Sequence, residues 1–334
     1  MAFDGLIGQN DVKKHLTDAI KNEHVGHAYI FCGEDGIGKK TFAREFAAMS
    51  MCTSPRENGE RCGICQSCRL MDAGNNTDFI TIVPPADKKT IVIDQIRDEL
   101  QEQTLKAPVF SRRKVFLITQ AEKMNENAQN ALLKTLEEPP EYVMILLACS
   151  NILNMLETIR SRTIRIDFAR NTNEEILQKY RILKNENAEE VSELLLCSYA
   201  DGIMGRVEHF TDNSSINDTR KQLAEVLERL FNGQIEAKTE MTKMIDVTSK
   251  KYDFIFFLMV SFARDAMIMA RFGRKAKILN TDLREALFRI GDAAGYYRLK
   301  NAIAVINECS GQLSKNAQAD LAVQNMLVKL SNRN

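Results

Sequence analysis

The chain has 334 residues, too many for one ordinary hydrophobic core, so we expect two or three domains. Its 45 basic and 45 acidic residues cancel, which argues against a dedicated nucleic-acid coat or a membrane-surface protein, although local basic patches remain compatible with this balance. The first residues form no charged-then-apolar signal, and the most apolar segment, 254–263, is far shorter than the roughly 20 residues of a spanning helix. We therefore expect a cytoplasmic protein without membrane contact.

The first half of the chain alternates strand-like and helix-like segments. Apolar runs predict strands at 28–32, 79–83, 114–118, 143–148 and 163–168. Helical periods at 41–51, 91–103 and 125–138 predict the helices between them. This alternation indicates a parallel sheet with helices on both faces.

The second half loses the strand signal after residue 170. Segments with helical character run from 172 to 210 and then over 219–231, 248–271, 280–290 and 296–331. The polar, Asn-containing stretch 212–215 predicts a linker between them. The predicted fold class is therefore α/β plus all-α, with a parallel-sheet domain over 1–170, a small helical lid over 171–212 and a helical C-terminal domain over 213–334.

A phosphate-binding loop with one altered residue follows the first predicted strand. The pattern G-x-x-x-x-G-K-[ST] cradles phosphates with backbone N–H groups and a Lys, and its hydroxyl holds Mg²⁺. Here Lys40 stands in the place of that hydroxyl, where a cation repels the metal. The loop and the helix that follows it can still hold an anion, so binding of ATP or ADP stays open. The candidate nucleotide-binding residues are Gly33, Gly36, Gly38, Lys39 and Thr41.

The expected nucleotide site also lacks a carboxylate at the end of a later strand. Nucleotide hydrolases with this arrangement use a carboxylate after a later strand to hold Mg²⁺ and another group to position water. The strand predicted at 114–118 is followed by Thr119 and Gln120, and Glu122 is expected to be a solvated residue near the next helix. The two losses argue against magnesium-dependent hydrolysis by this chain.

The cysteines at 52, 62, 65 and 68 form a C-x₉-C-x₂-C-x₂-C cluster. Four thiolates fill a tetrahedral zinc site and leave no open position, so a structural role is expected. An iron–sulfur cluster or unpaired thiols are the alternatives. The predicted metal ligands are Cys52, Cys62, Cys65 and Cys68. The remaining cysteines, Cys32, Cys149, Cys197 and Cys309, lie among apolar residues and are expected to be ordinary core thiols.

Several stretches together resemble bacterial clamp-loader subunits of the AAA+ class. They are FDGLIGQ at 3–9, HAYIF at 27–31, the four-cysteine insert and, most specifically, NALLKTLEEPP at 130–140. The resemblance is strong over about residues 1–210. It implies an AAA+ P-loop domain with a zinc module near 52–68, a lid and a C-terminal collar domain.

The resemblance also implies partners and further site residues. Motor subunits of this family (gamma/tau) have intact nucleotide motifs, so this chain is similar to a non-hydrolysing member that joins them and the delta subunit in a five-membered ring. Such a ring loads a sliding clamp onto primed DNA during replication. The family motif Ser-Arg-Cys is matched by Ser161-Arg162-Thr163, which implies that Arg162 acts in trans at a neighbour's ATP. Arg206 matches a lid arginine that senses phosphate, and is expected to be structural if no nucleotide binds.

Two other functions remain open at this point. One is an ATP-hydrolysing motor of the gamma/tau type, which needs Thr41 and a further carboxylate to replace the missing metal ligands. The other is a zinc-dependent nucleic-acid binding module, against which the neutral charge and the lack of interleaved aromatic residues count. Independent catalysis by the chain is accordingly uncertain.

Overall fold

The computed structural model describes residues 3, 5–85, 90–184, 192–211, 216–245, 252–314 and 318–332. The predicted linker 212–215 lies outside the described residues, as does the start of the helical period predicted from 248. The chain divides into two compact units. A sheet unit comprises Met1–Lys179 and Asp201–Gly205, and a helical unit comprises Tyr180–Ala200 and Arg206–Asn334. The division into three domains stays a prediction.

The sheet unit contains a five-stranded parallel sheet in the order β2-β3-β4-β1-β5. Its strands are β1 (Ala28–Cys32), β2 (Phe79–Ile82), β3 (Lys114–Thr119), β4 (Val143–Cys149) and β5 (Ile164–Asp167). The predicted parallel sheet is thus confirmed. β1, β3 and β4 are buried along their whole length, as expected for strands covered on both faces.

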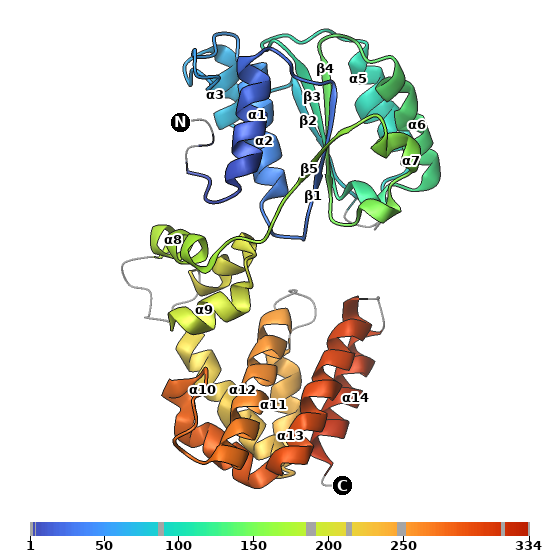
Figure 1. The fold of residues 1–334 in the computed structure, drawn as a ribbon. Helices are drawn as coiled ribbons and strands as arrows, with labels where there is room; N and C mark the ends of the chain where they lie inside the picture. Colours follow the sequence, from blue (N-terminus) through green and yellow to red (C-terminus); the bar gives the residue numbers. More distant parts are fainter. Residues whose placement is uncertain are drawn as a thin grey trace. The chain divides into compact units, whose positions relative to one another are not determined.

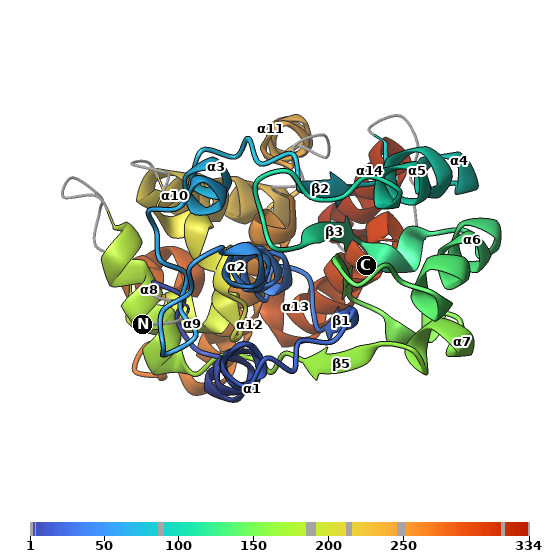
Figure 2. The ribbon, with the colours of Figure 1, turned by 90° about the horizontal axis from the view of Figure 1, so that it is seen from above.

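Helices cover both faces of this sheet (Figures 1 and 2). On one face lie α1 (Asn10–Lys21), α2 (Lys39–Met51) and α3 (Gln66–Asp72). On the other lie α4 (Ile93–Gln95), the π-helical η1 (Ile96–Gln101), α5 (Glu102–Thr104), α6 (Glu126–Glu137) and α7 (Glu157–Arg160). Short 3₁₀ turns η2 (Ala121–Lys123) and η3 (Ile152–Asn154) complete the unit. Successive residues of β1 alternate between the two cores: Tyr29 and Phe31 pack with α2, and Ile30 packs with α6.

Four described helices, α1, α3, α7 and α11 (Glu236–Met244), are absent from the predictions. The seven residues of α3 are too few to show a clear apolar period. The helix is also capped by a thiol, because the Sγ atom of the N-cap residue Cys65 accepts a hydrogen bond from the Cys68 N–H. The single helix expected over 91–103 is instead interrupted by the π-helical turn η1.

The helical unit contains α9 (Glu193–Ala200), the 3₁₀ segment η4 (Met204–Phe210) from Arg206 onward, α10 (Ile216–Phe231), α11, α12 (Tyr252–Phe272), the 3₁₀ turn η5 (Thr281–Leu283), α13 (Arg284–Ser314) and α14 (Ala319–Ser331). α8 (Asn173–Leu183) begins in the residues of the sheet unit. The break predicted between 290 and 296 is present, because Gly295 interrupts α13 with φ of 70°. The helix predicted from 296 to 331 is two helices, since α13 ends at Ser314 and α14 begins at Ala319.

The apolar face of α12 forms the core of the helical unit. Phe254, Leu258 and Phe262 are buried, so this face is covered by the unit itself. No described helix is long and apolar enough to span a bilayer.

Candidate functional site

The predicted nucleotide residues gather where the parallel strands end. Gly33 follows β1, Gln120 follows β3 and Ser150 follows β4, so all three lie at the carboxyl edge of the sheet. This is the edge at which open α/β sheets bind ligands. A cavity of about 480 Å³ lies here, lined by Asp35, Gly36, Gly38, Lys39, Lys40, Thr41, Val83, Pro84, Thr119, Gln120, Glu122, Ala148, Ser150 and Gly205. The altered residue of the loop and the altered end of β3 therefore face one cavity.

Backbone conformation explains the glycines of the loop. Gly36 and Gly38 have φ of 82° and 115°, a region that side chains disfavour. Gly33 does not line the cavity, but a Cβ there would lie 2.9 Å from Phe168 Cβ, and its N–H donates to Cys149 O at 3.2 Å. The loop leads into α2 with no side-chain cap, which leaves N–H groups of the first helical turn available to an anion.

The side chain of Lys39 makes its hydrogen bonds within the loop itself. Its Nζ donates to Gly33 O at 2.6 Å and Glu34 O at 2.9 Å, and lies 3.6 Å from Asp35 Oδ1. The residue is only 8% exposed. A phosphate bound here has to replace these backbone acceptors.

Glu122 is not the solvated residue that the sequence suggested. Its carboxylate accepts hydrogen bonds from the Ser150 N–H, at 3.2 Å, and from the Ser150 hydroxyl. Burial, together with this carboxylate, raises the pKa of the neighbouring Cys149 thiol to about 12. The prediction failed because the contact depends on the pairing of β3 with β4, which sequence periodicity does not reveal.

A connection that the sequence did not reveal fastens the loop to residues 201–205. The Gly205 N–H donates to Gly36 O at 2.9 Å, and a Cβ at Gly205 would lie 3.1 Å from the Gly36 Cα and O atoms. Arg170 reinforces the connection, because it binds both carboxylate oxygens of Glu34 and also Asp201. A glycine at position 205 is thus required by a backbone-to-backbone contact.

Arg162 lies at the opposite edge of the sheet from the phosphate loop. It comes just before β5, whereas the loop comes directly after the parallel strand β1. Its guanidinium donates to Thr158 O at 3.1 Å and pairs with Glu137 at 2.9 Å, and its side chain is 38% exposed. The strand direction therefore keeps Arg162 away from the chain's own cavity.

Arg206 makes its contacts inside the helical unit. It donates to Tyr199 O at 3.2 Å and lies 5.9 Å from the centre of the Tyr199 ring. Its charge also opposes the burial that raises the pKa of Asp253. These contacts explain a structural use of Arg206 without a nucleotide.

The four predicted metal ligands converge. The Sγ atoms of Cys52, Cys62, Cys65 and Cys68 all lie within 4.8 Å of one another. The Cys52 and Cys65 sulfur atoms are 3.9 Å apart, close to the roughly 3.8 Å that a tetrahedron with metal–sulfur bonds of about 2.3 Å requires. The cluster could therefore hold a metal ion, and its all-thiolate donor set fits zinc.

Backbone N–H groups favour the thiolate form of part of this cluster. Partial burial raises the pKa of Cys65, but hydrogen bonds from Thr53 and from the Cys68 N–H outweigh it and bring the pKa to about 6. The N–H groups of Ile64 and Cys65 lower the pKa of Cys62, whereas burial raises the pKa of Cys52 and Cys68. A bound cation would supply the missing stabilisation of these two thiolates. Elsewhere, Cys32, Cys149 and Cys309 are buried and Cys197 is half-buried.

The parallel sheet with a phosphate loop after β1 and a separate helical unit agree with the AAA+ architecture that the sequence resemblance implies. A family model described as "DNA polymerase III, delta subunit" matches residues 8–172. DNA polymerase III subunit delta' of Pseudomonas aeruginosa is 35% identical over 215 residues, which cover 63% of this chain and 63% of the relative. The tau/gamma subunit of Haemophilus influenzae is 36% identical over 163 residues, or 49% of this chain and 23% of the relative. A gamma subunit-related protein of Thermotoga maritima aligns with a TM-score of 0.49 at 18% identity, covering 95% of this chain and 99% of that one.

Over about half of its length or more, the chain is thus similar in sequence to delta, delta' and tau/gamma subunits of DNA polymerase III. It spans less than two thirds of the length of these two sequence relatives.

Proposed function

We propose that this chain is a non-hydrolysing clamp-loader subunit of the delta-prime type. It would join gamma/tau motor subunits and a delta subunit in a five-membered ring that loads the sliding clamp onto primed DNA. The observation that carries the proposal is the composition of the nucleotide cavity. Lys40 lines it in place of the magnesium hydroxyl, and Thr119 and Gln120 line it where the carboxylates of a hydrolase belong.

In this proposal, Arg162 is the residue through which this subunit takes part in ATP hydrolysis. It lies across the sheet from the chain's own loop, which favours action on the nucleotide of a neighbour. Its ion pair with Glu137 joins side chains that are 38% and 51% exposed, and such pairs contribute about 0–1 kcal/mol. A phosphate can displace Glu137 at this small cost, whereas an arginine supplied in trans accelerates phosphoryl transfer by about 10³ to 10⁵.

The cysteine cluster acts as a closed structural zinc site in this proposal. Four thiolates leave no position for water or substrate, so the metal would order residues 52–68 and take no part in hydrolysis. ATP or ADP would bind to the loop weakly or not at all, because Lys39 already bonds to the loop carbonyls.

One observation favours the alternative of an ATP-hydrolysing motor. Glu122 is a carboxylate on the wall of the cavity, where a replacement metal ligand is needed. Both of its oxygens accept hydrogen bonds from Ser150, however, and Lys40 lines the same cavity.

Measurements of ATP hydrolysis separate these functions. We expect negligible DNA-stimulated turnover by the chain alone, and full turnover by a ring reconstituted from motor subunits, delta and this chain. Arg162→Ala should abolish hydrolysis at the motor site facing this chain, while Arg160→Ala, at an exposed arginine two residues earlier in the chain, should not. Robust turnover by the lone chain would contradict the proposal. Equal turnover by wild-type and Arg162→Ala rings would remove the trans role of the arginine.

A further inference from the structure

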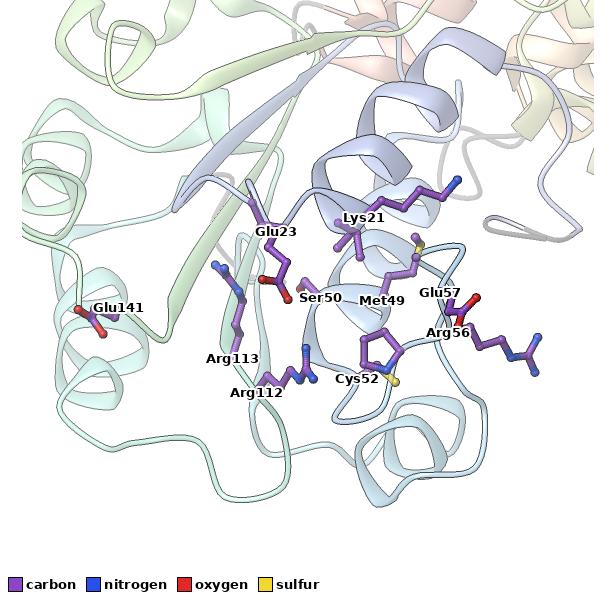
Figure 3. A pocket seen from close by; sticks show the side chains of 14 residues that line it. Lys21, Glu23, Met49, Ser50, Cys52, Arg56, Glu57, Arg112, Arg113 and Glu141 are labelled. Atoms are coloured by element: carbon purple, nitrogen blue, oxygen red, sulfur yellow. The ribbon is translucent and has the colours of Figure 1, made fainter.

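A second cavity lies at the edge of the sheet where the strands begin. Its volume is about 440 Å³, and its wall includes Val25 before β1, Arg112 and Arg113 before β3, and Glu141 before β4 (Figure 3). Because the strands are parallel, this cavity and the nucleotide cavity lie at opposite edges. The proposed function makes no use of it.

One wall of this cavity is apolar and the cysteine module completes it. Met49 and Cys52, at the end of α2, are each 1% exposed, and Ile20 and Val25 continue the apolar surface. Pro55 from the module closes this side. The module is held against α1 through Gly59, since a Cβ there would lie 2.9 Å from Lys21 Cγ.

The other wall carries two arginines without counter-ions. Among the residues that the structure describes, no carboxylate pairs with the guanidinium of Arg112 or Arg113, and no acceptor bonds to either group. Arg113 is half-buried, and this burial lowers its pKa. The Arg112 N–H donates to Met51 O at 3.1 Å, which ties the arginine pair to the end of α2. A partly desolvated guanidinium such as that of Arg113 is stabilised by an anion that binds it.

The charges that flank the cavity leave one net positive charge. Figure 3 shows the side chains of Lys21, Arg56 and Glu57 pointing away from it. Over all the charged residues that line the cavity, four basic side chains face three acidic ones: Lys21, Arg56, Arg112 and Arg113 against Glu23, Glu57 and Glu141. This balance matches a monoanion better than a doubly charged phosphate, and the planar arginine fork fits the two oxygens of a carboxylate.

We propose that this cavity binds the C-terminal carboxylate of a partner polypeptide whose last residue is apolar. The terminal residue carries its carboxylate and its side chain on one Cα, which matches an arginine pair beside an apolar wall. The volume lies within the range of ligand pockets, about 300–1,000 Å³. Arg112 and Arg113 bind the carboxylate, and the wall of Ile20, Val25 and Met49 takes the side chain.

Synthetic peptides test this assignment with the full-length chain. The probes are fluorescein-labelled hexapeptides that end in Leu, Phe, Gly or Asp, each as the free acid and as the amide, followed by anisotropy. Free acids ending in Leu or Phe should bind at least tenfold tighter than their amides, because amidation removes the carboxylate that accepts the charge-assisted hydrogen bonds. Arg113→Gln should weaken binding by at least tenfold, and Arg97→Gln, at an exposed arginine of the same unit, should leave it unchanged.

The outcomes that overturn the assignment are distinct. Equal affinity for acids and amides excludes recognition of the terminal carboxylate. If millimolar inorganic phosphate displaces the peptides and the peptides bind equally whatever their last residue, the cavity is a phosphate site instead. Absence of saturable binding by every probe below about 1 mM removes the site altogether. Thermal unfolding of each variant checks that it is folded, and the result does not depend on hydrolysis by the ring.

Discussion

Replacing Lys40 with Thr should give this chain a magnesium-dependent affinity for ATP. The substitution removes a cation from the wall of the nucleotide cavity and restores the hydroxyl that phosphate loops use to hold Mg²⁺. The rest of the loop is in place, since Gly36 and Gly38 have the required backbone conformation. Lys40 is therefore the simplest single residue to test.

The expected magnitude follows from Coulomb's law. Two unit charges 4 Å apart repel by about 1 kcal/mol in water and about 4 kcal/mol at an effective dielectric of 20, and the double charge of Mg²⁺ doubles these values. Lys40 is exposed, so the lower value, about 2 kcal/mol, applies, which corresponds to about 30-fold in affinity. Binding of ATP breaks the hydrogen bonds of Lys39 whether or not Mg²⁺ is present, so their cost does not change the ratio of the two affinities.

The assay measures the affinity of the purified chain for ATP by calorimetry, with Mg²⁺ and with EDTA. For the wild type we expect no gain from Mg²⁺, and for Lys40→Thr a gain of about 30-fold. Lys40→Met is the matched control, because it removes the same charge without adding a ligand; it should show about the same gain, and any excess for Lys40→Thr measures the contribution of the hydroxyl. If Mg²⁺ improves the affinity of the wild type as much as that of Lys40→Thr, the explanation from charge is wrong.

Three further predictions concern other residues. Glu137→Gln removes an exposed ion pair worth about 0–1 kcal/mol, so ATP turnover by the ring should change by no more than about fivefold. Arg162→Ala, by contrast, should abolish hydrolysis at one site. A large loss of turnover in Glu137→Gln rings would show that Glu137 does more than hold the arginine. In metal-free protein, the rate of alkylation of Cys65 should rise with pH with a midpoint near pH 6, because the pKa of this thiol is lowered to about 6. Metal binding should weaken as the pH falls through that value. A midpoint near pH 9 would contradict the hydrogen bonding described for Cys65. Gly205→Ala should lower the free energy of unfolding by about 1–3 kcal/mol in denaturant titrations, since its Cβ would press on Gly36; an unchanged midpoint would mean that residues 201–205 do not stay on the loop.

The sequence predicted those features that depend on short-range patterns. β1, β3 and β4 were visible as apolar runs because strands buried on both faces have no polar alternation. The convergence of the four cysteines was predictable because they fall within 17 residues and short spacings bring thiols together. The break in α13 lies where the helical periods 280–290 and 296–331 were predicted to separate, and the structure places it at Gly295, whose φ is 70°.

The features that the sequence did not reveal are contacts between distant segments. Glu122 and Ser150 are 28 residues apart and meet only because β3 pairs with β4. Gly205 meets Gly36 across a much longer separation, and nothing in the local pattern distinguishes it from a turn glycine. The cavity at the beginning of the strands is formed by residues from separate loops, so neither Arg112 nor Arg113 stands out in the sequence.

The direction of the strands is compatible with the proposal that this subunit does not hydrolyse ATP itself and acts at the nucleotide site of a neighbour. Residues after β1, β3 and β4 form the altered nucleotide cavity, while Arg162 precedes β5 at the other edge. The two sites share no described contact partner, and substitutions at separate sites act nearly independently. Lys40 could therefore replace a metal ligand without disturbing the position of Arg162. In the proposed ring, each interface would pair the loop edge of one subunit with the arginine of the next, so a subunit at the end of the series would need only the arginine.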